Sequence, residues 1–395
     1  MMNYNLVKII IVLIYSFLFG TNTIYCKNLN PIQQNNHFTS IGIAQKASLA
    51  DKSSSDVIFY NASEFEITGK LPQTNSYSRL PEAAKNKVRD PVWNLSTHTA
   101  GISIRFASNT TSVNIRWTLK NNSAFAHMTP IASKGFDLYA YVNNKWQFVG
   151  VARPQNSKTN QATIIEGMFK EDREYLLNLP LYDGVELIEI GIDQNAFIKK
   201  PDKQIIDKNN PIVFYGTSIT QGASASRPGL TYPSLTQRNL NREVINLGFS
   251  GNCRFEKAVA AFFMSADPGI IILDCTPNSP ADTIRKNLPE LVDYIRSIND
   301  TVPVIFIESI MRDFAYFKKE KESNIWTQRV INEQNNALHA VYEDKKRKYN
   351  HLYYLKSDML IGNDNEATID GVHFNDLGHF RAYKKIVRVI TEIIR

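Results

Sequence analysis

The second half of the chain alternates short apolar runs with helical patterns, and this alternation restricts the fold more than any other feature. Five runs have the length of buried strands, at residues 212–215, 244–247, 270–273, 304–307 and 352–355. Between them apolar residues recur at helical spacing, as at Ile284, Leu288 and Leu291, and they do so again over the last segment. Strand–helix alternation predicts a mainly parallel sheet that is covered by helices on both faces.

The first half of the chain has the period-two pattern of strands instead. Val113, Ile115 and Trp117 fall on one face of a predicted strand. The pair Asn143-Asn144 lies between two further strand-like runs and suits a two-residue hairpin turn, because asparagine tolerates positive φ. Many short strands joined by polar turns predict a β-sandwich.

The N-terminus has the features of a secretory signal. Lys8 precedes an apolar run that is too short for a comfortable membrane span and that polar residues close. An uncleaved anchor is the alternative. The predicted order is a signal peptide (1–26), a mobile lead (27–54), a β-sandwich domain (55–198), a charged linker (199–210) and an α/β domain (211–395). We therefore expect export to the periplasm or the extracellular space, without stable membrane insertion after signal removal.

The basic character of the chain does not indicate nucleic-acid binding. The formal net charge is +7, and the lysines are scattered except for a run at 345–348. That run falls at the end of a predicted helix, where basic side chains interact favourably with the helix dipole. No aromatic-rich binding motif accompanies it, so we expect no nucleic-acid partner.

Three cysteines do not form a disulfide scaffold, and no metal-ligand pattern is present. If Cys26 leaves with the signal, Cys253 and Cys275 remain. Each follows a predicted strand, so a bridge is conceivable, but two buried thiols are favoured. His373 and His379 could suggest a metal pair, yet His379 is predicted to lie in the final helix. We expect neither a metal nor a cofactor.

Ser218 lies between small residues directly after the first of the five apolar runs. The carboxyl end of a strand is where an open α/β sheet presents its chemistry. Far downstream, Asp370 and His373 place a carboxylate and an imidazole three residues apart, which supplies the three parts of a nucleophilic acyl-transfer site. We expect this pair to lie on a loop and Asp376 to cap the helix that follows.

Four blocks in the right order resemble those of the SGNH, or GDSL-like, hydrolases. They are Gly216-x-Ser218-x-Thr220-x-Gly222, the sequence NLGFSGN at 246–252, the sequence DCTPN at 274–278, and Asp370-x-x-His373. Thr217 stands where the family usually has aspartate, and the third block lacks its usual glycines. The segment GFDLY at 135–139 is similar to a motif of a bacterial subgroup with an extra N-terminal domain. The resemblance implies a three-layer α/β/α domain preceded by a β-sandwich.

The resemblance also implies roles for individual residues. Ser218 would be the nucleophile, His373 the base and Asp370 the carboxylate that orients it. The oxyanion hole would consist of the backbone N–H groups of Ser218 and Gly251 and the side-chain amide of Asn278. Within the GFDLY segment, Asp137 and Tyr139 are expected to have a structural role in the sandwich.

A β-sandwich joined to an SGNH-type α/β domain resembles the arrangement in some bacterial carbohydrate esterases, and this resemblance implies an exported serine esterase that removes acetyl groups from a carbohydrate. Its partner would be an acylated small-molecule or polysaccharide substrate. One alternative is a hydrolase of lipid or other short-chain acyl esters, which a broad apolar groove near Ser218 would favour. Another is an inactive carbohydrate-binding protein, against which the intact triad argues. An open polar cleft with an exposed tryptophan would favour saccharides, and the candidates are Trp93, Trp117, Trp146 and Trp326.

Overall fold

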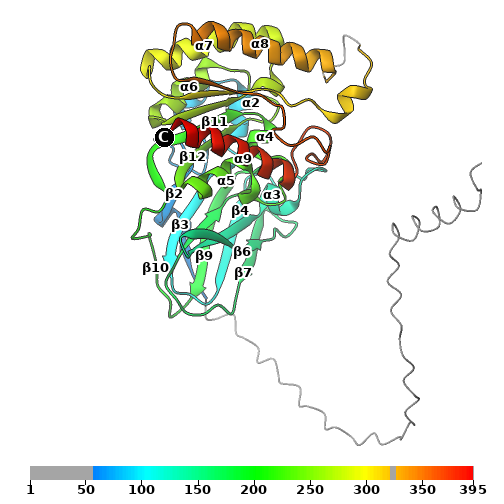
Figure 1. Cartoon of the computed structure of the whole chain (residues 1–395). Helices are drawn as coiled ribbons and strands as arrows, with labels where there is room; N and C mark the ends of the chain where they lie inside the picture. Colours follow the sequence, from blue (N-terminus) through cyan, green and yellow to red (C-terminus); the bar gives the residue numbers. More distant parts are fainter. Residues whose placement is uncertain (1–56, 321–325, 395) are drawn as a thin grey trace, which may run out of the picture. The chain divides into compact units, whose positions relative to one another are not determined.

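The computed structural model describes residues 57–320 and 326–394, which belong to one compact unit. The predicted signal peptide and the whole of the predicted lead lie outside the described residues. In Figure 1 the antiparallel strands gather at one end of the unit, and the α/β layers, with α7 and α8 outermost, gather at the other.

The α/β part is built on one parallel sheet with the strand order β12-β11-β13-β14-β15. Its strands are β11 (Asp207–Gly216), β12 (Arg242–Gly248), β13 (Ile270–Asp274), β14 (Val304–Ile307) and β15 (Leu352–Leu355). All five predicted strands are confirmed. β11 begins earlier than predicted, at Asp207 inside the expected linker, because Asp207 pairs with Arg242 of β12 before the register shifts at Ile212.

Helices cover both faces of this sheet. On one face lie α5 (Tyr232–Leu240) and α9 (Asp376–Ile393); on the other lie α6 (Lys257–Phe263), α7 (Ala281–Ile298) and α8 (Gln328–Lys346). Successive side chains of β11 alternate between the two cores: Ile212 and Phe214 face α5 and α9, whereas Val213 and Tyr215 face the other layer. The predicted three-layer α/β/α arrangement is therefore confirmed. Short 3₁₀ helices connect these elements at η4 (Pro228–Leu230), η5 (Met264–Ala266), η6 (Thr276–Asn278) and η7 (Asp313–Phe317).

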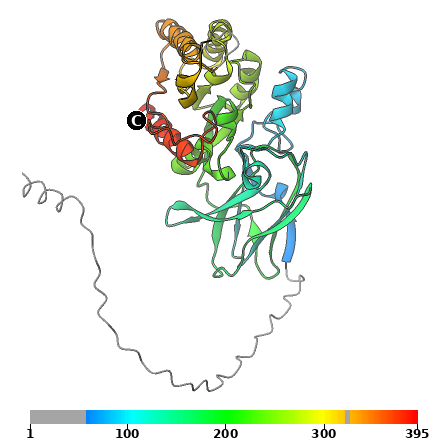
Figure 2. The same ribbon diagram turned by 90° about the vertical axis from the view of Figure 1, so that its right-hand side faces the viewer.

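The N-terminal part consists of two antiparallel sheets, and Figure 2 shows them edge-on beside the α/β layers. One sheet contains, in spatial order, β1 (Val57–Asn61), β9 (Val185–Asp193), β4 (Val113–Leu119) and β7 (Thr159–Ile165). The other contains β10 (Ile198–Lys199), β3 (Ser103–Ser108), β8 (Arg173–Asn178), β5 (Phe136–Val142) and β6 (Lys145–Ala152), with β2 (Glu66–Thr68) paired to β3. Their inner faces share one core. This confirms the β-sandwich.

Local predictions in the sandwich also hold. Val113, Ile115 and Trp117 are all buried in its core. Asn143 and Asn144 have φ values of 51° and 61° in the hairpin between β5 and β6. The remaining helices of this part are η2 (Ala62–Glu64), η3 (Glu82–Ala84), α2 (Asp90–Ser96) and α3 (Pro130–Lys134).

The GFDLY segment joins the sandwich to the α/β part. Asp137 is fully buried and accepts hydrogen bonds from Arg227 Nη1 at 2.6 Å and from the backbone N–H of Gly229 at 2.9 Å. The Arg238 guanidinium lies 3.9 Å from the centre of the Tyr139 ring. Asp137 also accepts from Asn178 of β8 at 2.9 Å, so the segment has the expected structural role in the sandwich and joins it to the α/β part as well.

The basic run at 345–348 lies at a helix end, as predicted. α8 ends at Lys346, and Lys345 forms an ion pair with Asp293 at 2.7 Å. Within residues 57–320 and 326–394, no helix has both the length and the apolar character that a membrane crossing requires.

Candidate active site

Ser218 occupies a tight strand-to-helix turn at the carboxyl end of β11. It is the first residue of α4 (Ser218–Gln221) and is 7% exposed. Thr217 caps this short helix: its hydroxyl accepts from Ile219 N–H, and its own N–H donates to Thr220 Oγ1. A Cβ at Gly216 would lie 1.8 Å from Thr220 Oγ1, so only glycine fits there. Threonine at 217, where the family pattern has aspartate, therefore holds the turn through a capping box.

A buried polar cluster braces this turn against β13. The Asp274 carboxylate accepts from Thr220 Oγ1 at 3.0 Å and from the Tyr232 hydroxyl at 2.6 Å. Burial raises the pKa of Asp274 to about 6, although both hydrogen bonds act to lower it. Thr220 thus connects the turn that carries Ser218 to the neighbouring strand.

The three predicted triad residues form one hydrogen-bonded line. His373 Nε2 lies 3.0 Å from Ser218 Oγ, and His373 Nδ1 lies 2.7 Å from Asp370 Oδ2. The other carboxylate oxygen of Asp370 accepts from the backbone N–H groups of Val372 and His373, at 2.9 and 2.8 Å. Burial acts to raise the pKa of Asp370, but the hydrogen bonds from His373 and Val372 outweigh it and lower the pKa below its usual value. The carboxylate is therefore ionised at neutral pH and can fix the imidazole tautomer.

Asp370 and His373 lie on the loop before α9, as expected, but the cap of that helix is not Asp376. Asn375 is the N-cap, and its side chain accepts from Gly378 N–H at 3.1 Å. Asp376 is the first helical residue, so its carboxylate points elsewhere and accepts from the backbone N–H and the hydroxyl of Ser226, at 2.8 and 2.6 Å. This contact ties the start of α9 to the segment that follows α4.

The predicted oxyanion donors follow three adjacent strands. Ser218 follows β11, Gly251 follows β12, and Asn278 ends η6 after β13. Because β11 lies between β12 and β13 in a parallel sheet, all three residues lie at the same edge. Gly251 has φ of 68°, a conformation that favours glycine. The fold therefore brings the three candidates to one edge, and their roles as donors remain a prediction.

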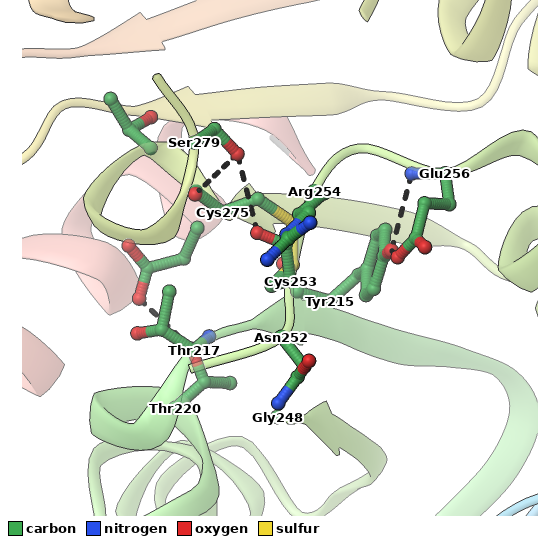
Figure 3. The surroundings of a disulfide bond; sticks show 12 residues. Tyr215, Thr217, Thr220, Gly248, Asn252, Cys253, Arg254, Glu256, Cys275 and Ser279 are labelled. Carbon is green, nitrogen blue, oxygen red and sulfur yellow. Dashed lines mark hydrogen bonds between the residues drawn. A yellow bond between two sulfur atoms is a disulfide. The ribbon is translucent and has the colours of Figure 1, made fainter. Parts of the chain in front are cut away.

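Cys253 and Cys275 form a disulfide with a Cα–Cα distance of 5.0 Å (Figure 3). The expectation of two buried thiols is therefore wrong. The loops after β12 and β13 converge beside the end of β11, which brings the two Cα atoms within disulfide range. The Ser279 hydroxyl spans both sides of the bridge, 3.2 Å from the carbonyl of Cys253 and 3.0 Å from that of Cys275. The bridge links the loop that carries Gly251 to the loop that carries Asn278.

We expect reduction of this disulfide to destabilise the protein and to slow turnover. The bridged cysteines are 22 residues apart in the sequence, and closing a loop of that length contributes about 3 kcal/mol. Dithiothreitol should lower the melting temperature of the wild type. A Cys253→Ser/Cys275→Ser variant should melt at that lower temperature both with and without dithiothreitol. Two alkylatable thiols in the denatured, unreduced protein would contradict the bridge.

Two further residues, both from the sandwich part, reach the triad and were missed by sequence reasoning. The Tyr182 hydroxyl donates to the backbone carbonyl of Ser218 at 3.2 Å. The His127 ring stacks on the His373 ring, with centroids 4.9 Å apart and an angle of 20° between the planes. Both residues lie in connecting segments without a periodic pattern, so no signal in the sequence marked them.

Each of the four tryptophans has structural contacts within the described residues. Trp117 is in the sandwich core, and Trp93 packs against the core of the α/β part. Trp146 donates to the Asn241 side chain at 3.0 Å, and the Arg312 guanidinium lies 3.7 Å from the centre of the Trp326 ring. These contacts give no support to any of the four as a sugar platform.

His379 lies in α9 as predicted and is fully buried. Burial is the main cause that lowers its pKa to about 4, so the ring is neutral at ordinary pH. Within the described ranges, no group of three or more His, Cys, Asp or Glu side chains is placed to hold a metal ion.

Comparison with known proteins agrees with this geometry. Residues 209–391 match the GDSL-like lipase/acylhydrolase family, and residues 57–198 match the GxDLY family, described as the N-terminus of SGNH-hydrolase-type esterases. A solved structure from Bacteroides ovatus, described as a GDSL-like lipase, is 34% identical with a TM-score of 0.80; the match covers 86% of this chain and 98% of that one. A search of curated proteins gave no significant match.

Two more distant structures share the fold. The salicylyl-acyltransferase SsfX3 from a tetracycline biosynthetic pathway is 16% identical with a TM-score of 0.70, over 85% of this chain and 97% of that one. A family two carbohydrate esterase from Clostridium thermocellum, solved with cellohexaose, is 11% identical with a TM-score of 0.53, over 75% and 93%. Fold, site and family matches together define a serine ester hydrolase. The chain belongs to the GDSL-like lipase/acylhydrolase family and has the GxDLY N-terminal domain of SGNH-type esterases.

Proposed function

We propose that this chain is an exported esterase that removes acetyl groups from a carbohydrate, with Ser218 as nucleophile. The observation that carries the chemistry is the hydrogen-bonded line from Asp370 through His373 to Ser218. The signal-like N-terminus supports export, and the surface beside the catalytic loop supports a saccharide.

In the acylation step Ser218 Oγ attacks the ester carbonyl carbon while its proton passes to His373 Nε2. The tetrahedral intermediate then collapses: the bond from the carbonyl carbon to the alkoxy oxygen breaks, and His373 returns the proton to the leaving sugar hydroxyl. Water repeats the sequence on the acetyl-serine and releases acetate and free Ser218. Asp370 holds the proton-bearing Nδ1 in place and stabilises the imidazolium that forms in both halves.

The oxygen of each tetrahedral intermediate carries a negative charge that needs fixed donors. The backbone N–H groups of Ser218 and Gly251 and the side-chain amide of Asn278 are the proposed donors. Loss of one donor of this kind costs about 100- to 1000-fold in rate. The Cys253–Cys275 bridge would hold the loops that carry Gly251 and Asn278 in place beside Ser218.

A groove of about 560 Å³ lies between η7 and residues 357–367, the segment that precedes Asp370 in the chain. η7 forms one side of it and presents Tyr316 and Phe317, which are 63% and 89% exposed. η7 also packs against the catalytic loop, since a Cβ on Gly371 would lie 2.4 Å from the Phe314 ring. The polar groups of the groove are the side chains of Asp313, Ser357, Asp358, Asn363 and Asn365. Exposed rings beside carboxylates and amides suit a sugar, which offers a C–H face and several hydroxyls.

The groove also bears on the alternatives. Its lining includes polar side chains such as Asn363 and Asn365 as well as apolar ones such as Ile310, Met359 and Ile361. A site for long acyl chains would gain about 0.8 kcal/mol for each methylene that it buries, and needs a largely apolar lining to do so. This favours the saccharide over the lipid substrate. The assembled triad argues against an inactive carbohydrate-binding protein.

The test compares acetylated oligosaccharides with p-nitrophenyl esters of increasing acyl length. We expect acetyl esters to be the best substrates and EDTA to leave turnover unchanged. Replacing both groove rings, Tyr316→Ala/Phe317→Ala, should raise KM for acetylated oligosaccharides about tenfold, because each ring contributes about 0.5–1.5 kcal/mol of stacking. The KM for p-nitrophenyl acetate should not change.

Phe380→Ala is the matched control, because Phe380 is an exposed ring on α9 that does not line this groove. It should leave both substrates unaffected. Rates that rise steadily from acetyl to octanoyl, together with a groove variant impaired only on long chains, would replace the saccharide with a lipid substrate.

A further inference from the structure

His127, on a loop of the sandwich part, stacks on one face of the catalytic imidazole. Both ring nitrogens of His373 are engaged in the plane of the ring, with Asp370 and with Ser218. The face of the ring has no such partner within the triad. His127 stacks on that face in a nearly parallel arrangement, with ring centroids 4.9 Å apart.

The loop that carries His127 is fixed at both ends. At its start, the backbone N–H groups of Asn121 and Asn122 donate to the two oxygens of the buried Asp183 carboxylate, at 2.9 and 2.6 Å. At its end, Thr129 caps α3, and its hydroxyl donates to the carbonyl of Ser226 at 2.7 Å. The loop is therefore held in place before any substrate binds.

Ser226 also ties this loop to the loop of His373. Its carbonyl accepts from Thr129, and its N–H and hydroxyl donate to Asp376, three residues after His373. One residue thus sets the separation between the two histidine loops. The Phe125 ring supports the arrangement further, because it meets His127 and Tyr182 edge-on, at 6.3 and 5.3 Å between centroids.

We propose that His127 is a positioning residue for ester hydrolysis, which holds the His373 ring in the triad plane and shields its positive charge from water. The catalytic imidazole must receive a proton from Ser218 and pass it to the leaving oxygen without rotating out of line. A ring packed on its face opposes that rotation. A neutral aromatic face beside an imidazolium also stabilises the charge that develops in the transition state.

The charges around His127 agree with a neutral ring. Burial is the main cause that lowers its pKa below the usual value, and the neighbouring His373 acts in the same direction. Asp370 opposes them and is outweighed. A neutral His127 avoids repulsion with His373 when the latter is protonated during turnover.

The inference rests on the role proposed for His373 and is independent of the sugar, so p-nitrophenyl acetate is the probe. His127→Ala should lower kcat about tenfold with KM within a factor of two, because the contact acts on charge that forms only during reaction. His127→Phe keeps a ring on the same face and should retain most of the wild-type kcat. His127→Gln keeps a polar side chain without a ring and should behave like the alanine variant.

His339→Ala is the control. His339 lies on α8, is half-exposed and, like His127, contacts another aromatic ring, that of Tyr354, which it meets edge-on. Its kcat should equal that of the wild type. Wild-type kcat in folded His127→Ala or His127→Gln would overturn the proposal. A loss of kcat in His127→Phe as large as that in His127→Ala would also overturn the proposal, because an aromatic ring on that face would then not maintain kcat. Full activity of a Ser218→Ala variant would instead reject the catalytic mechanism itself.

Discussion

Ser218→Ala should lower kcat/KM for p-nitrophenyl acetate by at least about 10⁴-fold while leaving a folded protein. In the proposed mechanism this hydroxyl forms the acyl-enzyme, and it lies 3.0 Å from the base that would take its proton. Its removal creates no large cavity, so the melting temperature should stay close to that of the wild type. Steady-state kinetics and thermal unfolding measure the two effects.

Ser224→Ala is the matched control for this substitution. Ser224 lies six residues further along the chain, and its buried hydroxyl has no hydrogen-bond partner within the described residues. It should therefore keep wild-type activity. Equal activity losses in Ser218→Ala and Ser224→Ala would point to a general effect on this segment instead of a nucleophile.

Asp370→Asn should lower kcat by about 10³-fold, because the amide would present an N–H to Nδ1 of His373 and stabilise the wrong imidazole tautomer. Asp370 is 38% exposed at its side chain, so water can take over part of its role, which makes the loss smaller than for a fully buried carboxylate. Binding of substrate should be little affected. The measurement is kcat and KM with p-nitrophenyl acetate across pH 6–9.

Asp364→Asn serves as the control on the same loop. Asp364 pairs with Arg381 at 2.7 Å on the surface, where water screens the ion pair, and this pair does not involve the triad. Its kcat should be unchanged. An Asp370→Asn variant as active as Asp364→Asn would show that His373 works without its carboxylate partner.

Much of the fold could be predicted because its signals are local. Five apolar runs of strand length and the helical spacing at Ile284, Leu288 and Leu291 are readable from the sequence, and all have their counterparts in the sheet and in α7. The position of Ser218 followed from the same source, whereas Asp370 and His373 followed from the resemblance of their block to that of a known family. Ser218 comes directly after a predicted strand, and parallel strands bring such residues to one edge.

The features that sequence reasoning missed depend on how distant segments pack. His127 and Tyr182 reach the triad only because the sandwich part lies against the α/β part. The first polar residue of β11, Asp207, becomes a strand residue only through pairing with Arg242. The state of Cys253 and Cys275 depends on two loops that converge in space, which their spacing in the chain does not reveal. No periodic pattern encodes such contacts.

The most direct test of the serine mechanism is covalent labelling with a serine-directed phosphonate, followed by intact mass measurement and peptide mapping. We predict one label for each active molecule, located on Ser218, with loss of activity in proportion to labelling. The label should be absent in Ser218→Ala and unchanged in Ser224→Ala. A label on another residue, or an active wild type that resists labelling at Ser218, would contradict the assignment of the nucleophile.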